Sequence, residues 1–445
     1  MSLDRKPTDL RTLTGREALV EVFRQAERQE GLRRVGLEHE RLVYPRGSSR
    51  PLPYDGPDGI AGLLAALEPA GYQPFRETPE GPTIALTRGS LTVSLEPGGQ
   101  VELSGTPFST AREALAESTL HASHLRSAAE ARGLVPVCIG YRPWGVPAEM
   151  PWMPKERYTA MRGTLGKRGP LALDMMLMTC TTQVSLDWTD EADCARKVTL
   201  AARLAPVLLA LYANSPLVRG QPSGWQSYRS RVWNDVDPAR CGYFPALVDG
   251  SFSYQAYCDW ALAAPLLFLR RDGRYLTPRL TFAELLAKGW DGQPALASDW
   301  TDHLSTLFPE VRIKSVLEVR SADSGPLVTA GALAALWRGL LYDARALDDA
   351  GRLLPRLPFA EHLAFHAEAQ RNGLRGAVRG IAIGELARGM VAVAREGLQR
   401  LDPLDVPLLE PLEEIVRSGR SPADVLLAAF AKDPSPASVF AVTAL

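Results

Sequence analysis

Apolar and polar residues alternate along two neighbouring stretches of the chain, 91–96 and 100–104. Alternation with a period of two predicts β-strands, and the run Pro97-Gly98-Gly99 between the stretches predicts a turn. The pattern therefore predicts a β-hairpin with one apolar face. The opposite face carries the polar side chains of Thr92, Ser94, Glu96, Gln100, Glu102 and Ser104.

Three further segments, 34–43, 180–188 and 316–320, have the same period of two. Glu is depleted in β-strands, so several strands that each turn Glu toward one face indicate a site. The polar faces of these segments carry, in chain order, Glu38 and Glu40, then Thr181, Gln183, Ser185 and Asp187, and last Glu318 and Arg320.

Two interpretations fit this pattern. The polar face of any one strand can be the solvated outer face of an antiparallel sheet, which is the simpler explanation for a single strand. Glutamates on several segments together favour the second interpretation, in which the carboxylates converge. Clustered carboxylates repel one another, and proteins that gather them bind hard cations such as Mg²⁺, Mn²⁺ or Ca²⁺ through oxygen ligands. Convergence would therefore indicate a site for metal ions and phosphate groups.

Outside the strands, apolar residues recur every three or four positions, which predicts amphipathic helices. Ser109 is a suitable N-cap for a long helix that Gly133 ends. From about residue 327 onward the pattern is almost wholly helical. We therefore predict an α+β protein, with an acidic antiparallel sheet backed by helices and a helical C-terminal part. The predicted helices are 15–29, 60–70, 109–132, 190–214, 330–341, 359–369, 381–398 and 423–431.

Composition and charge exclude several classes of partner. The 445 residues are 46% hydrophobic and 23% charged, which is ordinary for a soluble globular protein. Lys and Arg number 50 against 51 Asp and Glu, so no bulk attraction to nucleic acid or to an anionic membrane is expected. No apolar run has the length of a membrane span, and residues 1–23 do not resemble a signal peptide. We expect a cytoplasmic protein.

The Cys and His residues do not predict a metal centre of their own. The five cysteines show no CxxC spacing, which disfavours a zinc site and favours reduced, buried thiols. The pairs His121/His124 and His362/His366 have ligand spacing on helices but lack the Glu of a zincin motif or a nearby third ligand. The chain also has no P-loop and no strand–helix GxGxxG motif, so a nucleotide would have to be held by metals, Arg and strand edges.

Several ordered runs of the sequence resemble the plant and proteobacterial type of glutamate–cysteine ligase. The resemblance extends from about residue 30 to about residue 350, which makes it more specific than a single motif. The runs are GLEHE (36–40), SLEPGGQVELSG (94–105), MPKERYTAMRG (153–163), LALDMMLMTCTTQVSLDW (171–188), LYANSPLVRGQPSGWQSYRSRVWNDVD (211–237) and DHLSTLFPEVRIKSVLEVRSADSGP (302–326).

The resemblance implies both a fold and a reaction. The fold would be the funnel-shaped sheet shared with glutamine synthetase, with a catalytic domain at 1–350 and a helical part at 351–445 that packs on it. The reaction would join the γ-carboxylate of L-glutamate to the amine of L-cysteine. ATP would phosphorylate glutamate to γ-glutamyl phosphate, and the products would be γ-glutamylcysteine, ADP and phosphate. Mg²⁺ or Mn²⁺ would be the cofactor, and the protein would be a monomer or a homodimer that serves glutathione or a related thiol pathway.

The resemblance also assigns roles to individual residues. Arg320 would contact the phosphates, and Gln183 stands where some relatives place a metal-binding His, so we place it in the nucleotide site. Glu38, Glu318 and Arg320 would carry the catalytic step. The implied metal ligands are Glu38, Glu40, Glu96, Glu102 and Glu318.

Arginines and aromatic residues supply the implied substrate pocket. Arg162 and Arg229 would grip substrate carboxylates with their bidentate guanidinium groups, with Arg231 as the near alternative to Arg229. Trp233 and Tyr257 would line the pocket for the amine substrate. A salt bridge within the carboxylate cluster remains the structural alternative for the arginines.

Two other functions remain open at this point. The first is a ligase of the same mechanism that joins glutamate to a different amine, because the amine pocket is the least readable part of the sequence. The second is a non-catalytic sensor of glutamate or nucleotide, although binding alone does not need the full set of glutamates. Plant relatives have a redox-controlled disulfide, but residues 328–332, VTAGA, contain no Cys where one of its cysteines would lie. We therefore expect no such switch here.

Overall fold

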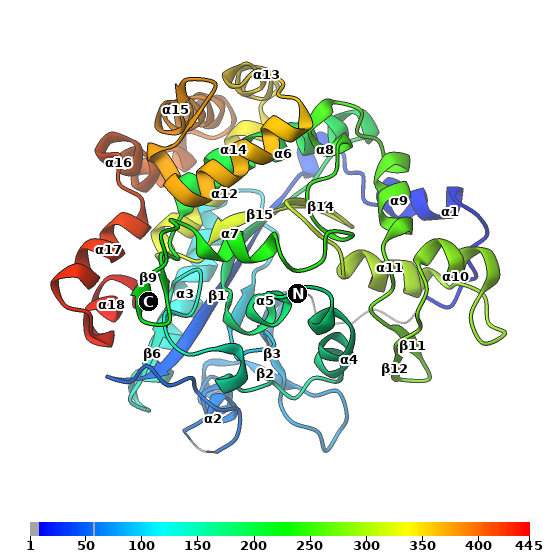
Figure 1. The fold of residues 1–445 in the computed structure, drawn as a ribbon, viewed down its shortest axis with the longest axis horizontal. Helices are drawn as coiled ribbons and strands as arrows, with labels where there is room; N and C mark the ends of the chain where they lie inside the picture. Colours follow the sequence, from blue (N-terminus) through cyan, green and yellow to red (C-terminus); the bar gives the residue numbers. More distant parts are fainter. Residues whose placement is uncertain (1–8, 57) are drawn as a thin grey trace.

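The computed structural model describes residues 9–56 and 58–445, and its centre is one large antiparallel sheet (Figure 1). The strands follow the order β14-β15-β7-β1-β5-β4-β3-β2, and β6 pairs with β1 beside this path. The strands of this sheet are β1 (Val35–Pro45), β2 (Gln73–Phe75), β3 (Ala85–Arg88), β4 (Leu91–Leu95), β5 (Val101–Ser104), β6 (Leu134–Val137), β7 (Thr181–Leu186), β14 (Val311–Ile313) and β15 (Leu317–Asp323).

Strand β1 lies in the middle of the sheet and sets the register of the polar face. Its first half pairs with β5 on one side and β7 on the other, and its second half pairs with β6. Glu38 lies opposite Ser104 and Gln183, while Glu40 lies opposite Glu102. Side chains two residues apart share a face, so the polar positions of three strands lie side by side.

The opposite face of the sheet is apolar and is covered by helices. Helices α3 (Ala111–Glu130), α6 (Glu191–Tyr212) and α12 (Leu327–Tyr342) pack on it, and α12 is buried along almost its whole length. Burying each Val or Leu side chain here contributes about 1.5–3 kcal/mol, whereas a slip of one residue would turn all of them outward. The apolar face therefore fixes which way the glutamates point. Its side chains include Val35, Leu37, Val184, Leu186, Leu317 and Val319.

The C-terminal helices pack on the same core. Helix α15 (Ile383–Leu401) packs along α12, and α14 (Phe359–Asn372) packs along α6 (Figure 1). A boundary between residues 350 and 351 would fall inside α13 (Ala344–Leu353). The predicted division into a catalytic domain and a C-terminal part is not tested by this arrangement and stays a prediction.

The remaining elements surround the sheet. The other helices are α1 (Glu17–Arg24), α2 (Ile60–Ala65), α4 (Glu156–Thr164), α5 (Ala172–Met178), α7 (Tyr228–Trp233), α8 (Ala246–Asp249), α9 (Tyr254–Ala263), α10 (Phe282–Lys288), α11 (Ala297–Ser305), α16 (Glu410–Ser418), α17 (Pro422–Lys432) and α18 (Pro436–Thr443). Two-stranded pairs are β8 (Leu217–Val218) with β9 (Gln221–Pro222), β10 (Cys241–Gly242) with β13 (Phe308–Pro309), β11 (Leu269–Arg271) with β12 (Arg274–Leu276), and β16 (Ala377–Val378) with β17 (Ile381–Ala382). Short 3₁₀ helices are η1 (Glu30–Leu32), η2 (Glu68–Ala70), η3 (Pro147–Glu149), η4 (Leu165–Lys167), η5 (Gly373–Arg375) and η6 (Pro403–Leu409).

The predicted α+β class with an antiparallel sheet and backing helices is confirmed. One detail differs, because the N-cap of α3 is Thr110 and not Ser109. The Thr110 hydroxyl accepts from the backbone N–H of Glu113, whose carboxylate accepts from the Thr110 N–H, so a reciprocal capping box sets the helix start. Within the described residues, no helix is long and apolar enough to cross a membrane.

Candidate active site

A cavity of about 870 Å³ lies over the polar face of the sheet. Strands β1, β5 and β7 supply one wall, and α7, α11 and the segment before α1 supply others. A cavity of this size is at the upper end of small-molecule sites, which suits more than one substrate at a time. The predicted site residues that line it are Glu38, Glu40, Glu96, Glu102, Gln183, Arg229, Trp233 and Arg320.

The carboxylates on the β1 and hairpin side repel one another. Burial raises the pKa of Glu40 well above its usual value, and the nearby Glu96 and Glu102 raise it further. Burial and Glu102 likewise raise the pKa of Glu96 to about 7, and burial, Glu102 and Glu318 raise that of Glu38. The Glu40 carboxylate accepts the Thr181 N–H at 2.9 Å, which offsets only part of this cost. This side of the cavity therefore favours a bound cation.

Glu318 has the opposite surroundings. Its carboxylate lies 2.5 Å from Arg320, 2.6 Å from Arg312 and 3.5 Å from Lys314. Burial alone would raise the pKa of Glu318, but these three cations hold it well below its usual range. Arg320 also donates to the Gln183 side-chain oxygen at 2.5 Å. This hydrogen bond from Arg320 to Gln183 fixes the direction of the Arg320 side chain, which lines the cavity.

Burial also disfavours the charged forms of the basic residues around Glu318. Burial lowers the pKa of Arg312 although Glu318 opposes the effect, and burial together with Arg312 lowers the pKa of Lys314. Cations that are buried beside one another bind an anion readily, because the anion removes their mutual repulsion. This side of the cavity therefore favours phosphate or carboxylate groups.

Arg229 and Trp233 reach the cavity from α7, one turn apart. Ser227 caps this helix by accepting the Ser230 N–H, which fixes the direction in which the helix leaves the loop. The Arg229 guanidinium is almost fully buried and donates to the Arg320 carbonyl at 2.9 Å. Trp233 packs against Phe308 with ring centroids 5.4 Å apart and forms an apolar part of the wall.

Two predicted substrate residues lie away from this cavity. Arg162 is exposed on α4, where its guanidinium stacks on Trp152 at 4.9 Å. Tyr257 is fully buried in the apolar core among Phe23, Phe244 and Trp260. The prediction that these two residues join the pocket does not agree with their positions. Arg162 packs on Trp152, and Tyr257 packs against other aromatic rings of the core.

Arg231, the alternative to Arg229, also points away from the cavity. It forms an ion pair with Asp235 at 2.7 Å and lies over the Trp225 ring at 5.7 Å. Two residues along a helix differ in direction by about 200°, so only one of Arg229 and Arg231 can face the site. The structure favours Arg229.

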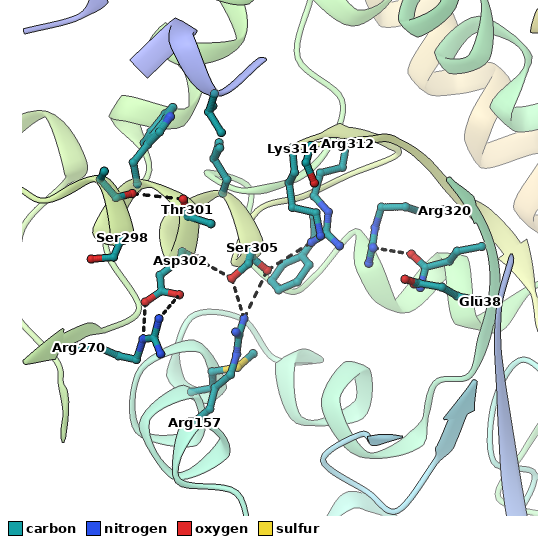
Figure 2. A pocket seen from close by; sticks show the side chains of 18 of the residues that line it. Glu38, Arg157, Arg270, Ser298, Thr301, Asp302, Ser305, Arg312, Lys314 and Arg320 are labelled. Carbon is teal, nitrogen blue, oxygen red and sulfur yellow. Dashed lines mark hydrogen bonds and ion pairs between the residues drawn. The ribbon is translucent and has the colours of Figure 1, made fainter. Parts of the chain in front are cut away.

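Sequence reasoning missed several basic residues that line the cavity. Arg312 and Lys314 lie on and just after β14, and Arg157 and Arg270 come from α4 and β11. Figure 2 shows Arg157 and Arg270 turned toward α11, where they interact with Ser305 and Asp302. The alternation of Arg312, Lys314 and the apolar residues between them was a signal, but a strand of three residues is too short to identify from the pattern.

The carboxylate oxygens of this site are the type of ligand that hard divalent cations prefer. Glu38, Glu40, Glu96 and Glu102 offer only oxygen ligands, and repulsion between neighbouring carboxylates raises the pKa of Glu38, Glu40 and Glu96. In the described part of the chain, however, no three His, Cys, Asp or Glu residues are already close enough to hold an ion. The chemistry of the residues therefore fits Mg²⁺ or Mn²⁺, and the side chains would have to draw together around the ion.

The sequence model of glutamate–cysteine ligase family 2 matches residues 34–441. The chain is 38% identical over 399 residues to the chloroplastic glutamate–cysteine ligase of Brassica juncea, which covers 88% of this chain and 77% of the relative. It is 37% identical over 417 residues to the enzyme of Arabidopsis thaliana, covering 93% and 79%. The fold is also similar to that of a glutamate–cysteine ligase from Francisella tularensis in complex with AMP, with a TM-score of 0.57, 12% identity and 92% and 89% of the two chains covered.

The comparison corrects the expected location. These plant relatives are chloroplastic proteins, so the prediction of a cytoplasmic protein is wrong. The prediction rested on the charge and hydropathy of residues 1–23, whereas the sheet, its helices and the cavity need the same side chains in either compartment. The catalytic fold therefore does not indicate the compartment in which the protein works.

Family and reaction follow from the matched region and the relatives together. The match spans the sheet, most of the C-terminal helices and every glutamate, arginine and aromatic residue of the site described above, while the part of the cavity wall before residue 34 lies outside it. The chain therefore belongs to glutamate–cysteine ligase family 2 and is an ATP-dependent enzyme that joins glutamate to cysteine to give γ-glutamylcysteine.

Proposed function

We propose that the cavity over the sheet holds ATP, L-glutamate and L-cysteine together, with divalent cations bound by Glu38, Glu40, Glu96 and Glu102. The observation that carries this proposal is the separation of charge along one cavity. Glu40 and Glu96, whose pKa values are raised by burial and by neighbouring carboxylates, lie toward β1 and the hairpin, and crowded cations lie toward β14 and β15. Bound Mg²⁺ or Mn²⁺ would supply positive charge beside the transferring phosphoryl group.

The cations on the other side would bind the phosphates. Arg320 offers a planar guanidinium that Glu318 and Gln183 already orient, and Arg312 and Lys314 add charge beside it. Preorganised cations stabilise the charge that develops on the phosphoryl oxygens without reorganising during the reaction. Glu318 would serve as a further metal ligand once the phosphates draw these cations away from it.

Arg229 would hold the carboxylate of an amino-acid substrate, and Trp233 would form the wall beside it. The Arg229 side chain is 4% exposed and lines the cavity, so a carboxylate that reaches it is removed from water. A bidentate pair in such a place is shorter and stronger than one at the surface. Fixing the carboxylate would orient the γ-carboxylate or the amine for attack.

The chain would work as one catalytic unit. The C-terminal helix α14 packs on α7, where Gln370 donates to the Ser230 carbonyl at 3.0 Å. Residues 351–445 would therefore support the site and would not form an independent domain. The predicted catalytic domain at 1–350 would need them to hold Arg229 and Trp233 in place.

The test is a reconstituted reaction with purified protein. We expect ADP and phosphate release only when ATP, L-glutamate, L-cysteine and Mg²⁺ are all present, with γ-glutamylcysteine identified by mass spectrometry. A chelator should abolish turnover. Release of AMP and pyrophosphate, or turnover that ignores the chelator, would contradict the proposal. Replacing L-cysteine with a panel of other amines tests the alternative acceptor.

A further inference from the structure

A buried carboxylate, Asp323, lies at the end of β15 and outside the set of glutamates. It is fully buried and accepts hydrogen bonds on both oxygens. The backbone N–H of Asn214 and the hydroxyl of Ser215 donate to one oxygen at 2.8 and 2.6 Å, and the hydroxyl of Ser227 donates to the other at 2.9 Å. Asp323 thereby ties the loop before α7 and the cap of that helix to the strand that carries Glu318.

The position of Asp323 is also fixed by packing. Gly140 lies so close that a Cβ atom there would be 2.5 Å from the Asp323 carboxyl carbon. A side chain at residue 140 would have to displace the carboxylate. The chain therefore builds a specific place for this buried charge, with donors on one side and a bare glycine on another.

Arg229 is the charged group that Asp323 faces. One guanidinium nitrogen lies 3.8 Å from an Asp323 oxygen, and the other terminal nitrogen donates to the Arg320 carbonyl. The backbone N–H of Arg229 donates to the Ser215 hydroxyl at 3.0 Å. Among the described residues, Asp323 is the one carboxylate within ion-pair distance of Arg229. The two residues and Ser215 form one connected unit.

Another carboxylate competes for the same arginine. Glu40 lies in the same cavity and also attracts the Arg229 guanidinium. Without a fixed partner, the Arg229 side chain would turn toward Glu40. There it would neutralise the Glu40 carboxylate, and its N–H donors would no longer be available to a substrate. The ion pair with Asp323 and the bond to the Arg320 carbonyl hold it back from that position.

We propose that Asp323 is a positioning residue that holds the Arg229 guanidinium over the cavity and away from Glu40, and so sets the affinity for one amino-acid substrate. The inference rests on the proposed role of Arg229 as the clamp for a substrate carboxylate. Asp323 does not touch substrate. It acts through the direction and charge balance of Arg229.

The main experiment is Asp323→Asn in the full chain, with KM measured separately for L-glutamate, L-cysteine and ATP. Removal of the charge at constant size should raise the KM for one amino acid about tenfold and change the KM for ATP less than about twofold. The amino acid affected must be the one whose KM rises in Arg229→Lys. In the double variant Asp323→Asn/Arg229→Lys, the second change should add less than about twofold, because both act on one contact.

Asp187→Asn is the matched control. Asp187 is also buried, accepts the Arg34 N–H at 2.7 Å and the Arg28 side chain at 3.1 Å, and does not line the cavity. Both Asp187→Asn and Asp323→Asn should lower the melting temperature, but Asp187→Asn should leave all three KM values unchanged. Equal KM changes in the two variants would overturn the inference, since they would report general loosening of the fold.

The outcomes separate this inference from the proposed function. If Arg229→Lys changes no amino-acid KM, the role of Arg229 fails and the inference fails with it. If Arg229→Lys raises a KM and Asp323→Asn does not, the inference alone is wrong. Should Asp323→Asn not fold, Ser215→Ala decides, because it removes one donor to Asp323 and should raise the same KM about two- to threefold. An unchanged KM in folded Ser215→Ala would overturn the inference.

Discussion

The two sides of the cavity use the same kind of residue in opposite surroundings. Glu40 faces other carboxylates, and burial raises its pKa well above the usual value, whereas Arg312, Lys314 and Arg320 hold the pKa of Glu318 well below it. Both residues lie on one sheet. The difference shows that the glutamates, which sequence reasoning treated as one set, differ in their surroundings. Neighbouring carboxylates raise the pKa of Glu38, Glu40 and Glu96, whereas three close cations lower that of Glu318.

The two sides of the cavity should bind their ions in different orders. The side near β1 can attract a divalent cation in the absence of nucleotide, because neighbouring carboxylates raise the pKa of Glu40 and of Glu96 there. On the side near β15, Arg312, Lys314 and Arg320 surround Glu318 until an anion draws them away from it. We therefore expect a cation site that is independent of ATP and a second one that depends on it.

Glu318→Gln is expected to give the largest effect. It removes the charge that holds Arg312, Lys314 and Arg320 together at nearly constant volume. The loss of transition-state stabilisation should lower kcat at least about a hundredfold. Steady-state kinetics at saturating Mg²⁺ measures this, after circular dichroism has shown that the variant folds. A kcat close to that of the wild type would remove Glu318 and its cations from the catalytic step.

Arg229→Lys should give an intermediate effect that is confined to binding. Lysine keeps the charge but loses the bidentate guanidinium, so the KM for one amino acid should rise about tenfold while the KM for ATP stays nearly constant. Arg231→Lys is the control, since Arg231 pairs with Asp235 outside the cavity and should change neither constant. A rise chiefly in the KM for ATP in Arg229→Lys would instead place Arg229 on the phosphate side.

Oxidation should give the smallest effect. The five cysteines are free and buried, and burial raises the pKa of Cys138 to about 11 and of Cys258 to about 12, so neither forms a reactive thiolate. Activity of the air-oxidised protein should change less than about twofold on adding dithiothreitol. A severalfold rise, together with a mobility shift on a non-reducing gel, would reveal a disulfide that the fold does not suggest.

The sequence predicted the parts of the site that regular patterns encode. Glu38, Glu102 and Gln183 follow from alternation in strands whose apolar faces are buried, and the register of β1 places them side by side. Tyr257 was misplaced because an aromatic residue on a helix packs equally well into a core or a pocket. Arg162 was misplaced because stacking on Trp152 satisfies an arginine without a substrate.

Asp323 shows a different limit of sequence reasoning. Its neighbours Asn214, Ser215 and Ser227 lie about a hundred residues earlier in the chain, as the separations in their hydrogen bonds show. No local pattern records such a contact, because the sheet and α7 bring the segments together only after folding. The same holds for the balance of charge around Glu40 and Glu318, which depends on the full set of neighbours.

The most direct test of the two-sided cavity is to measure Mn²⁺ binding to the nucleotide-free protein by electron paramagnetic resonance or calorimetry. The account predicts that Glu40→Gln weakens this binding at least about tenfold, whereas Glu318→Gln changes it less than about twofold until ATP is added. Equal weakening by both substitutions, or a larger loss in Glu318→Gln, would contradict the division of the cavity into a carboxylate side and a cation side.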